Sequence, residues 1–217
     1  MGMVIDPAVT ALLAEYEQRA KAEWQQIGTL SREQLESRID EFLLCVGPET
    51  GRLLHLLATS LKAQHIVEIG VSYGYSTIWL ADAARKTGGK VHSFELSSKK
   101  VDFARDKLRS VGLDTYVEFH VGNAVETLTQ LRGGDPIDLV LIDLWKSLYR
   151  PCFELVYPKL STEGVVVADN MLMPEETRPD ALLYQQHVRS KGDLDSVLLP
   201  IGAGIELSRK RGPNRPA

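Results

Sequence analysis

The segment HIVEIGVSYGYSTIWLADAARKTGGKVHSFEL, residues 65–96, contains the pattern that predicts the fold of the chain. HIVEIG and KVHSFEL are short runs rich in β-branched and aromatic residues, which is typical of strands. The residues between them, 75–89, read as a helix that two glycines terminate. A strand, a helix and a second strand in this order predict a right-handed crossover between two parallel strands.

The same alternation of strands and helices continues toward the C-terminus. The expected elements are a helix at 98–112, a strand at 116–121, a helix at 124–133, a strand at 137–143, a helix at 149–160 and a strand at 164–170. SVLLPIGAGIELSRK, residues 196–210, reads as two strands around Gly202 and Gly204, and a hairpin there would make the last strand antiparallel. The sequence therefore predicts an α/β fold with a doubly wound, mostly parallel seven-stranded sheet.

The first sixty residues lack this alternation and read as helices. Asp6 is a candidate N-cap for a helix that ends at Ile27, with Pro7 in its first turn. A second helix is expected at 31–46, because Ser31 and Gln34 have capping-box spacing. One apolar face of that helix would consist of Leu35, Ile39, Phe42 and Leu43.

A third helix at 49–62 completes this N-terminal region. We therefore expect one domain over residues 1–217, with a helical cap at 1–62, a catalytic α/β core at 63–210 and a tail at 211–217. The basic, proline-containing end of the tail is typical of a frayed, solvated segment.

The composition excludes several classes of protein. With 217 residues, 44% hydrophobic, and a formal net charge of -4, the chain is ordinary for a globular domain. The acidic balance argues against a nucleic-acid coat and against a basic membrane-surface protein. We find neither a secretory signal nor an apolar run long enough to span a membrane. Cys45 and Cys152 lack CxxC spacing, so we expect buried, reduced thiols in a cytoplasmic protein.

The glycine loop after the first strand is the first candidate binding element. In open α/β sheets, ligands bind beyond the carboxyl ends of the strands. Gly70 and Gly74 in VEIGVSYGYS would let the backbone approach a ligand closely. Their GxxxG spacing differs from the GxGxxG of dinucleotide-binding proteins, so the loop gives no support for a diphosphate.

Three further positions suggest a ligand for this loop. Glu95 ends the second predicted strand, where its carboxylate could accept hydrogen bonds from both hydroxyls of a ribose or simply be a solvated charge. Glu68 lies inside the first strand, and a ligand ammonium is a natural partner for a buried carboxylate. The GNA motif at 122–124 could contact an adenine edge through Ala124. Together these positions suggest a ligand in which a nucleoside carries an amino acid, and S-adenosylmethionine is such a molecule.

Oxygen-bearing side chains also end the fourth and fifth predicted strands. Asp143 follows VLI, and Asp169 and Asn170 follow VVVA. Neighbouring parallel strands lie about 4.8 Å apart, so the three side chains can converge. Such a donor set suits Mg²⁺, with Mn²⁺ or Ca²⁺ as alternatives. The other interpretation is a set of turn-forming or capping residues.

Two residues in the loop after Asp143 are candidates for roles in the chemistry. Near a divalent cation the pKa of Lys146 would fall, which favours a general base, although an exposed lysine is the other interpretation. The Trp145 side chain could pack against the adenine of the cofactor or against the substrate, or it could pack in the core.

In this order, the motifs VEIGVSYGYS, FEL, GNA, LIDLWKSLY and VVVADN resemble those of the cation-dependent O-methyltransferases. That group includes catechol O-methyltransferase, the plant caffeoyl-CoA O-methyltransferases and many small bacterial enzymes. The resemblance runs from about Phe42 to Arg209, and its most specific element is DLWK followed about 23 residues later by ADN. It implies a Rossmann-like class I methyltransferase fold.

The resemblance also implies roles for individual residues. Asp143, Asp169 and Asn170 would hold the metal, and Lys146 would take the proton of the acceptor hydroxyl. Asp143 and Asn170 would act in catalysis through this metal. The cofactor contacts that it implies are Val46, Glu68, Gly70, Ser76, Glu95, Ala124 and Asp143. Bacterial and plant members are commonly dimers, so we expect a homodimer.

The leading hypothesis is a metal-dependent O-methyltransferase for a small vicinal dihydroxy aromatic of the catechol, caffeoyl or flavonoid type. One alternative, also by resemblance, is methylation of a hydroxyuridine in tRNA. The basic tail mildly favours a tRNA substrate, whereas the negative net charge mildly opposes one. Another alternative is a nucleotide-binding domain without catalysis. The Trp24 and Met173 side chains could line an acceptor pocket or pack in the core.

Overall fold

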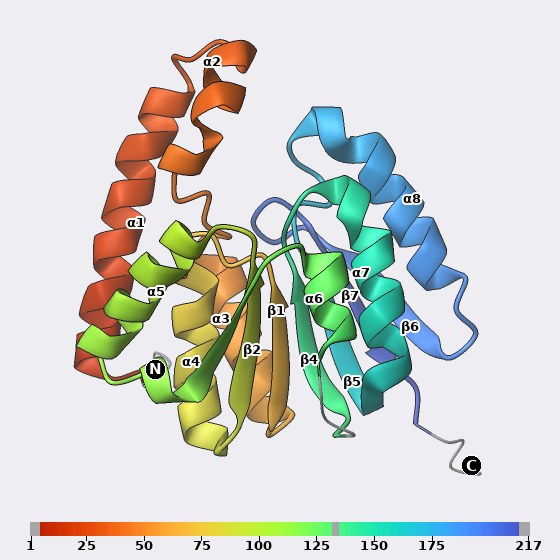
Figure 1. Ribbon diagram of the computed structural model, residues 1–217. Coiled ribbons are helices and arrows are strands. Elements are labelled where there is room, and N and C mark those ends of the chain that lie inside the picture. The colour runs from red at the N-terminus through yellow and green to blue at the C-terminus, as the bar shows by residue number, and fades with distance from the viewer. Residues whose placement is uncertain (1–4, 132–134, 213–217) are drawn as a thin grey trace.

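The computed structural model describes residues 5–131 and 135–212. Its strands form one seven-stranded sheet in the order β3-β2-β1-β4-β5-β7-β6 (Figure 1). Every pair from β3 to β5 is parallel, whereas β7 is antiparallel to both β5 and β6. The predicted mixed sheet and its antiparallel last strand are confirmed. The strands are β1 (His65–Ile69), β2 (Lys90–Glu95), β3 (Val117–Val121), β4 (Ile137–Ile142), β5 (Leu160–Ala168), β6 (Leu194–Leu199) and β7 (Ile205–Lys210).

Helices cover both faces of the sheet. One face carries α3, α4 and α5, with α1 packed outside α4, and the other face carries α6, α7 and α8 (Figure 1). A short helix, α2, lies beyond one end of the sheet, beside the far end of α1. The helices are α1 (Pro7–Ile27), α2 (Arg32–Arg38), α3 (Pro48–Ser60), α4 (Tyr75–Thr87), α5 (Ser98–Ser110), α6 (Ala124–Thr129), α7 (Tyr149–Val156) and α8 (Arg178–Arg189).

This double cover explains why the central strands are continuously apolar. Leu139 and Leu141 of β4 belong to the core on the α3 and α4 side, and Val140 and Ile142 belong to the core on the α7 side. All four side chains are fully buried. A polar side chain at the tip of such a strand is therefore held by a rigid, well-packed element.

The predicted helix at 31–46 is wrong in its second half. The α2 helix ends at Arg38, a 3₁₀ turn covers Ile39–Glu41, and the chain is not helical from 42 to 46. The backbone groups of Leu43 are used in tertiary contacts, because its N–H donates to Glu23 (2.7 Å) and its carbonyl accepts from the Ser72 hydroxyl (2.9 Å). Burial of the Leu43 side chain therefore reflects an extended segment.

Other differences lie near the predicted boundaries. The α6 helix ends at Thr129, before the predicted end at 133, and residues 132–134 lie outside the described part of the chain. The α8 helix was not predicted, although Ala181, Tyr184 and Val188 are buried on one face at helical spacing. Of the predicted tail at 211–217, residues 213–217 lie outside the described residues.

The segment after α2 connects the N-terminal helices to the glycine loop. The Tyr73 hydroxyl donates to the Asp40 carbonyl (2.6 Å), and Lys100 donates to the Asp40 carboxylate (2.6 Å). Together with the Ser72–Leu43 hydrogen bond, these contacts place residues 39–43 over the carboxyl end of β1. Among the described residues, no helix is both long enough and apolar enough to cross a membrane.

Candidate functional site

The glycine loop lies directly against the tip of β4. Gly70 and Gly74 have φ values of +96° and +94°, in the left-handed region that favours glycine. A Cβ at position 70 would lie 1.8 Å from the carbonyl oxygen of Asp143. Any side chain at Gly70 would thus push apart the two segments that form the predicted site.

Glu95 holds the shape of this loop. One carboxylate oxygen accepts hydrogen bonds from the N–H groups of Val71 (3.2 Å) and Ser72 (2.9 Å). The other oxygen accepts from the N–H of Ser97 (3.0 Å). The side chain is half-buried at the end of β2, so it is not merely a solvated charge. These three bonds leave acceptor capacity on Oε1 for a further donor such as a ribose hydroxyl.

Glu68 is fully buried on β1, and its partners differ from the expected one. Three hydroxyls lie within hydrogen-bond distance of its carboxylate, from Ser76 (2.6 Å), Thr77 (2.8 Å) and Ser93 (2.7 Å). These hydroxyls occupy the position predicted for a ligand ammonium. Burial outweighs these bonds and raises the pKa of Glu68 to about 7. A contact between Glu68 and the cofactor stays a prediction.

The acids at the tips of β4 and β5 lie side by side. The N–H of Asp143 donates to the Ile69 carbonyl (2.8 Å) and that of Asp169 to the Ile142 carbonyl (3.1 Å), which continues the parallel pairing by one residue. Burial raises the pKa of Asp143. Burial, followed by the charge of Asp143, raises the pKa of Asp169 to about 8. The two carboxylates are therefore close enough to repel each other.

One oxygen of Asp169 has a bonding capacity that the protein does not use. Its Oδ1 accepts from the N–H of Asn170 (2.7 Å), whereas its buried Oδ2 has no hydrogen-bond partner among the described residues. Asn170 has φ +54°, a left-handed conformation that asparagine tolerates better than most residues. A buried, unpartnered carboxylate oxygen beside a second carboxylate fits a bound cation.

Lys146 lies on the other side of Asn170. Its Nζ contacts the Tyr149 hydroxyl and lies 3.4 Å from Asn170 Oδ1. The Tyr149 hydroxyl donates to the Asp169 carbonyl (3.1 Å). Burial lowers the pKa of Lys146, while the nearby Asp143 and Asp169 act in the opposite direction. The lysine is half-buried and fixed, so the interpretation as an exposed lysine is wrong.

Sequence reasoning missed the residues that hold these groups in place. Tyr149 fixes Lys146, the N–H of Ser72 donates to Glu95, and the hydroxyls of Thr77 and Ser93 donate to Glu68. Tyr149 is three residues after Lys146, on the helical segment that follows the loop, and this i, i+3 spacing was the available signal. The partners of Glu68 come from two elements, α4 and β2, so spacing alone does not identify all of them.

The remaining predicted residues are distributed around the same edge of the sheet. Val46 is buried before α3, and Ala124 begins α6 after the capping residue Asn123. Trp145 is 67% exposed, which excludes the core-packing interpretation. Trp24 and Met173 are also exposed, so core packing is wrong for both.

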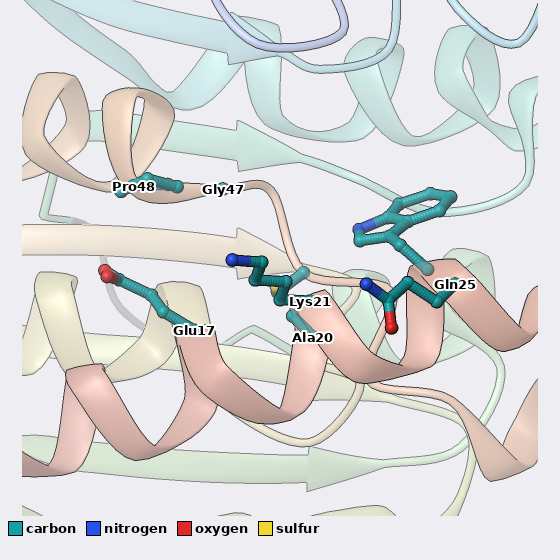
Figure 2. A pocket seen from close by; sticks show the side chains of 8 residues that line it. Glu17, Ala20, Lys21, Gln25, Gly47 and Pro48 are labelled. Atoms are coloured by element: carbon teal, nitrogen blue, oxygen red, sulfur yellow. The ribbon is translucent and has the colours of Figure 1, made fainter.

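A groove of about 560 Å³ lies between α1 and the start of α3. Figure 2 shows Lys21 extending from α1 toward the Gly47–Pro48 segment. The strand-tip acids do not line this groove, so it is separate from the candidate site. Its lining residues are Glu17, Ala20, Lys21, Trp24, Gln25, Cys45, Gly47 and Pro48.

Comparison with known proteins shows that this chain is similar to methyltransferases. A family profile described as a methyltransferase domain matches residues 67–171. The chain is 36% identical over 132 residues to a catechol O-methyltransferase from Niastella koreensis, a match that covers 59% of either chain and thus less than two thirds of that relative. It is 33% identical over 155 residues to a catechol O-methyltransferase from Mycobacterium tuberculosis, covering 69% of this chain and 70% of that one.

Two solved structures extend the likeness over nearly the whole chain. Cofactor-bound Rv0187 from MTB superimposes with a TM-score of 0.75 at 28% identity, covering 96% of this chain and 92% of that one. The O-methyltransferase TomG from Streptomyces achromogenes, in complex with SAM, gives a TM-score of 0.76 at 26% identity and the same coverage. Both relatives support the Rossmann-like methyltransferase fold.

Proposed function

Because the chain belongs to the cation-dependent O-methyltransferases, a family of S-adenosylmethionine-dependent enzymes, we propose that it methylates a hydroxyl of a small vicinal dihydroxy aromatic with the help of a divalent metal. The observation that carries this proposal is the unpartnered Oδ2 of Asp169 beside the Asp143 carboxylate. A cation there compensates the buried Asp169 and the half-buried Asp143 carboxylates, which form no ion pair among the described residues.

The residues present fit such a metal. Asp143, Asp169 and Asn170 offer hard oxygen donors without a histidine or a cysteine, which suits Mg²⁺, with Mn²⁺ or Ca²⁺ as alternatives. When bound, the divalent cation supplies positive charge that lowers the pKa of a neighbouring acceptor hydroxyl. Relatives named catechol O-methyltransferase support a catechol-type acceptor, which would offer two adjacent oxygens to this site.

The chain's own groups would then perform the proton transfer. Neutral Lys146 would take the proton of the acceptor hydroxyl at Nζ, while Tyr149 and Asn170 hold that nitrogen in place. The bound methyl donor would supply the methyl group, whose carbon–sulfur bond would break as the oxygen–carbon bond forms, with S-adenosylhomocysteine as the leaving group. The rigid β1, β4 and β5 tips would align donor and acceptor, an effect worth up to about 7–11 kcal/mol in well-oriented systems.

The cofactor would lie along the glycine loop. Gly70 lets the loop pack directly against the Asp143 backbone, and Oε1 of Glu95 at the end of β2 keeps capacity to accept from a ribose hydroxyl. A relative of similar structure is known in complex with SAM, which supports this cofactor. Val46, Glu68, Ser76, Ala124, Asp143 and Trp145 are proposed as further contacts.

Methyl transfer from labelled S-adenosylmethionine to a panel of catechols and caffeoyl compounds, with Mg²⁺ and with EDTA, tests the proposal. We expect product only with the metal. Product formed equally well in EDTA would contradict the metal site, and failure of every catechol despite cofactor binding would contradict the acceptor class. The tRNA alternative depends partly on a tail that extends beyond the described residues. The homodimer and the cytoplasmic location stay predictions.

A further inference from the structure

A second group of metal-binding side chains lies on the edge of the sheet, away from the strand-tip acids. It consists of His92 on β2 and of Glu118 and His120 on β3. His92 pairs with Glu118 in the parallel register, and residues two apart on a strand share a face. His92 precedes Glu95 by three residues, so the group lies roughly 10 Å back along the strand from the glycine-loop contact.

The three donor groups converge on one point. His92 Nδ1 lies 3.3 Å from His120 Nε2, Glu118 Oε2 lies 3.8 Å from the first nitrogen, and Glu118 Oε1 lies 3.7 Å from the second. Ligands bound to tetrahedral Zn²⁺ at about 2.0–2.1 Å lie about 3.3 Å from one another. The nitrogen pair already has this separation, whereas the exposed Glu118 side chain must rotate to bring one oxygen within ligand distance of both nitrogens.

Hydrogen bonding alone does not explain this arrangement. The two rings can share one N–H between their facing nitrogens, but both carboxylate distances exceed those of a hydrogen bond. The carboxylate therefore faces both nitrogens without bonding either one. A single cation between them would satisfy all three groups at once.

The surroundings prepare both rings for a metal. The His120 ring stacks on Phe94 with centroids 4.5 Å apart and an angle of 13° between the planes, which fixes its orientation. Burial lowers the pKa of both histidines. Glu118 favours a cation at this site, whereas Lys90 and His65 oppose one.

We propose that His92, Glu118 and His120 form a site for a transition-metal ion, with Zn²⁺ as the ion that fits best. Two imidazoles and one carboxylate match the ligands that Zn²⁺ takes when a fourth position is open to solvent. The ion would tie the edge strand β3 to β2 and would be independent of the proposed oxygen-donor site for Mg²⁺. Zinc binding should therefore raise the melting temperature of the protein.

The test is equilibrium dialysis of the full chain against Zn²⁺ in excess Mg²⁺, which occupies the oxygen-donor site. We expect one tightly bound Zn²⁺ per wild-type chain. His120→Phe keeps the stacking on Phe94 but removes the nitrogen, and we expect it to weaken binding by at least about 100-fold. His187→Phe is the matched control, because it removes a histidine on α8 that pairs with Glu154 and takes no part in the three-residue group.

Melting curves without metal show whether each variant folds. His92→Phe and Glu118→Gln provide independent evidence if His120→Phe is unstable. Loss of the zinc-dependent rise in melting temperature in all three site variants, with the rise kept in His187→Phe, supports the site. Equal binding by wild type and the site variants overturns it, as does the absence of zinc binding to the wild type.

Discussion

The buried acids of this protein fall into two sets that differ in how their charge is compensated. Asp82 on α4 is fully buried and contacts His55 (2.9 Å), Lys86 (2.9 Å) and Arg85. Burial opposes its ionisation, but the hydrogen bonds from His55 and Lys86 outweigh it and lower the pKa of Asp82 to about 2. Glu206 on β7 is likewise buried and accepts two hydrogen bonds from Arg189, at 2.7 and 2.9 Å.

The acids at the carboxyl ends of β1, β4 and β5 lack such cations. Among the described residues, Glu68, Asp143 and Asp169 form no ion pair, and burial raises the pKa of all three. The protein thus compensates Asp82 and Glu206 with its own cationic side chains, bonds Glu68 with hydroxyls only, and leaves the acids of β4 and β5 for a ligand. The difference indicates where a cation and a cationic cofactor are to be expected.

Among substitutions of these acids, we expect the largest effect on activity from Asp169→Ala. Loss of one metal ligand should lower kcat/KM by about 10³-fold or more, which corresponds to about 4 kcal/mol of transition-state stabilisation. The free energy of unfolding should not fall, because the substitution removes an uncompensated buried charge. Methyl transfer assays with Mg²⁺ and urea unfolding measure the two quantities.

Asp195→Ala is the control for this change, since Asp195 is an exposed acid on β6 paired with Arg211. It should leave both activity and stability nearly unchanged. Asp169→Ala protein that keeps its activity in the presence of a chelator would contradict the metal assignment.

Lys146→Ala should have the next largest effect. The Lys146 side chain places a cation among the tip residues, through its contacts with Tyr149 and Asn170. Loss of a general base lowers kcat by roughly 10²–10⁴-fold, whereas the dissociation constant of S-adenosylmethionine should change little. Steady-state kinetics and calorimetric cofactor titration separate the two.

Tyr149→Phe provides a second test of the role of Lys146. It keeps the ring but removes the hydroxyl that contacts Lys146, so we expect a smaller fall in kcat and no change in cofactor affinity. A Lys146→Ala variant that loses cofactor affinity but keeps its kcat would assign the lysine to binding and not to catalysis.

Much of this arrangement could be predicted from the sequence because it depends on chain order. Parallel strands end at the same edge of a sheet, so polar residues immediately after β1, β4 and β5 had to meet there. The extended segment at 42–46 could not be predicted in the same way. Its conformation depends on Glu23 and Ser72, which are distant in sequence from Leu43.

The partners of Glu68 show the same limit. Its burial was predicted from its place within an apolar strand, but Ser93 comes from the neighbouring strand and Thr77 from the helix after the loop. Which hydroxyls face a buried carboxylate depends on the register of β1 against β2, where Glu68 pairs with Ser93. Register is a tertiary property that a local pattern does not contain.

For the compensated set, Asp82→Asn should lower the free energy of unfolding by about 3 kcal/mol, because it removes the buried charge to which His55, Arg85 and Lys86 are bonded. The turnover of the folded fraction should be unchanged, since Asp82 lies on α4 away from the strand tips. Asp106→Asn, in an exposed pair with Arg109, is the control and should cost at most about 1 kcal/mol. Equal effects of the two substitutions in urea unfolding would contradict the internal compensation of Asp82.

The smallest effect expected is a change in the pH dependence of stability on Glu68→Gln. The pKa of Glu68 is raised to about 7 in the folded protein from an ordinary value of 4.5, so the folded state binds more protons between these values. Its contribution to stability is then complete below about pH 4.5 and is lost as the pH rises through about 7. Between pH 5 and pH 8 the wild type should lose about 2–3 kcal/mol relative to the uncharged variant.

Urea unfolding of both proteins at pH 5 and pH 8 measures this difference, and subtracting the two proteins cancels groups that titrate in both. The glutamine fits the same space, and the hydroxyls of Ser76, Thr77 and Ser93 can turn to accept from its amide. If the two stability profiles run parallel, the three hydroxyls compensate the charge of Glu68 completely. Glu68 would then belong with Asp82 among the structural acids, and only the acids of β4 and β5 would be left for a ligand.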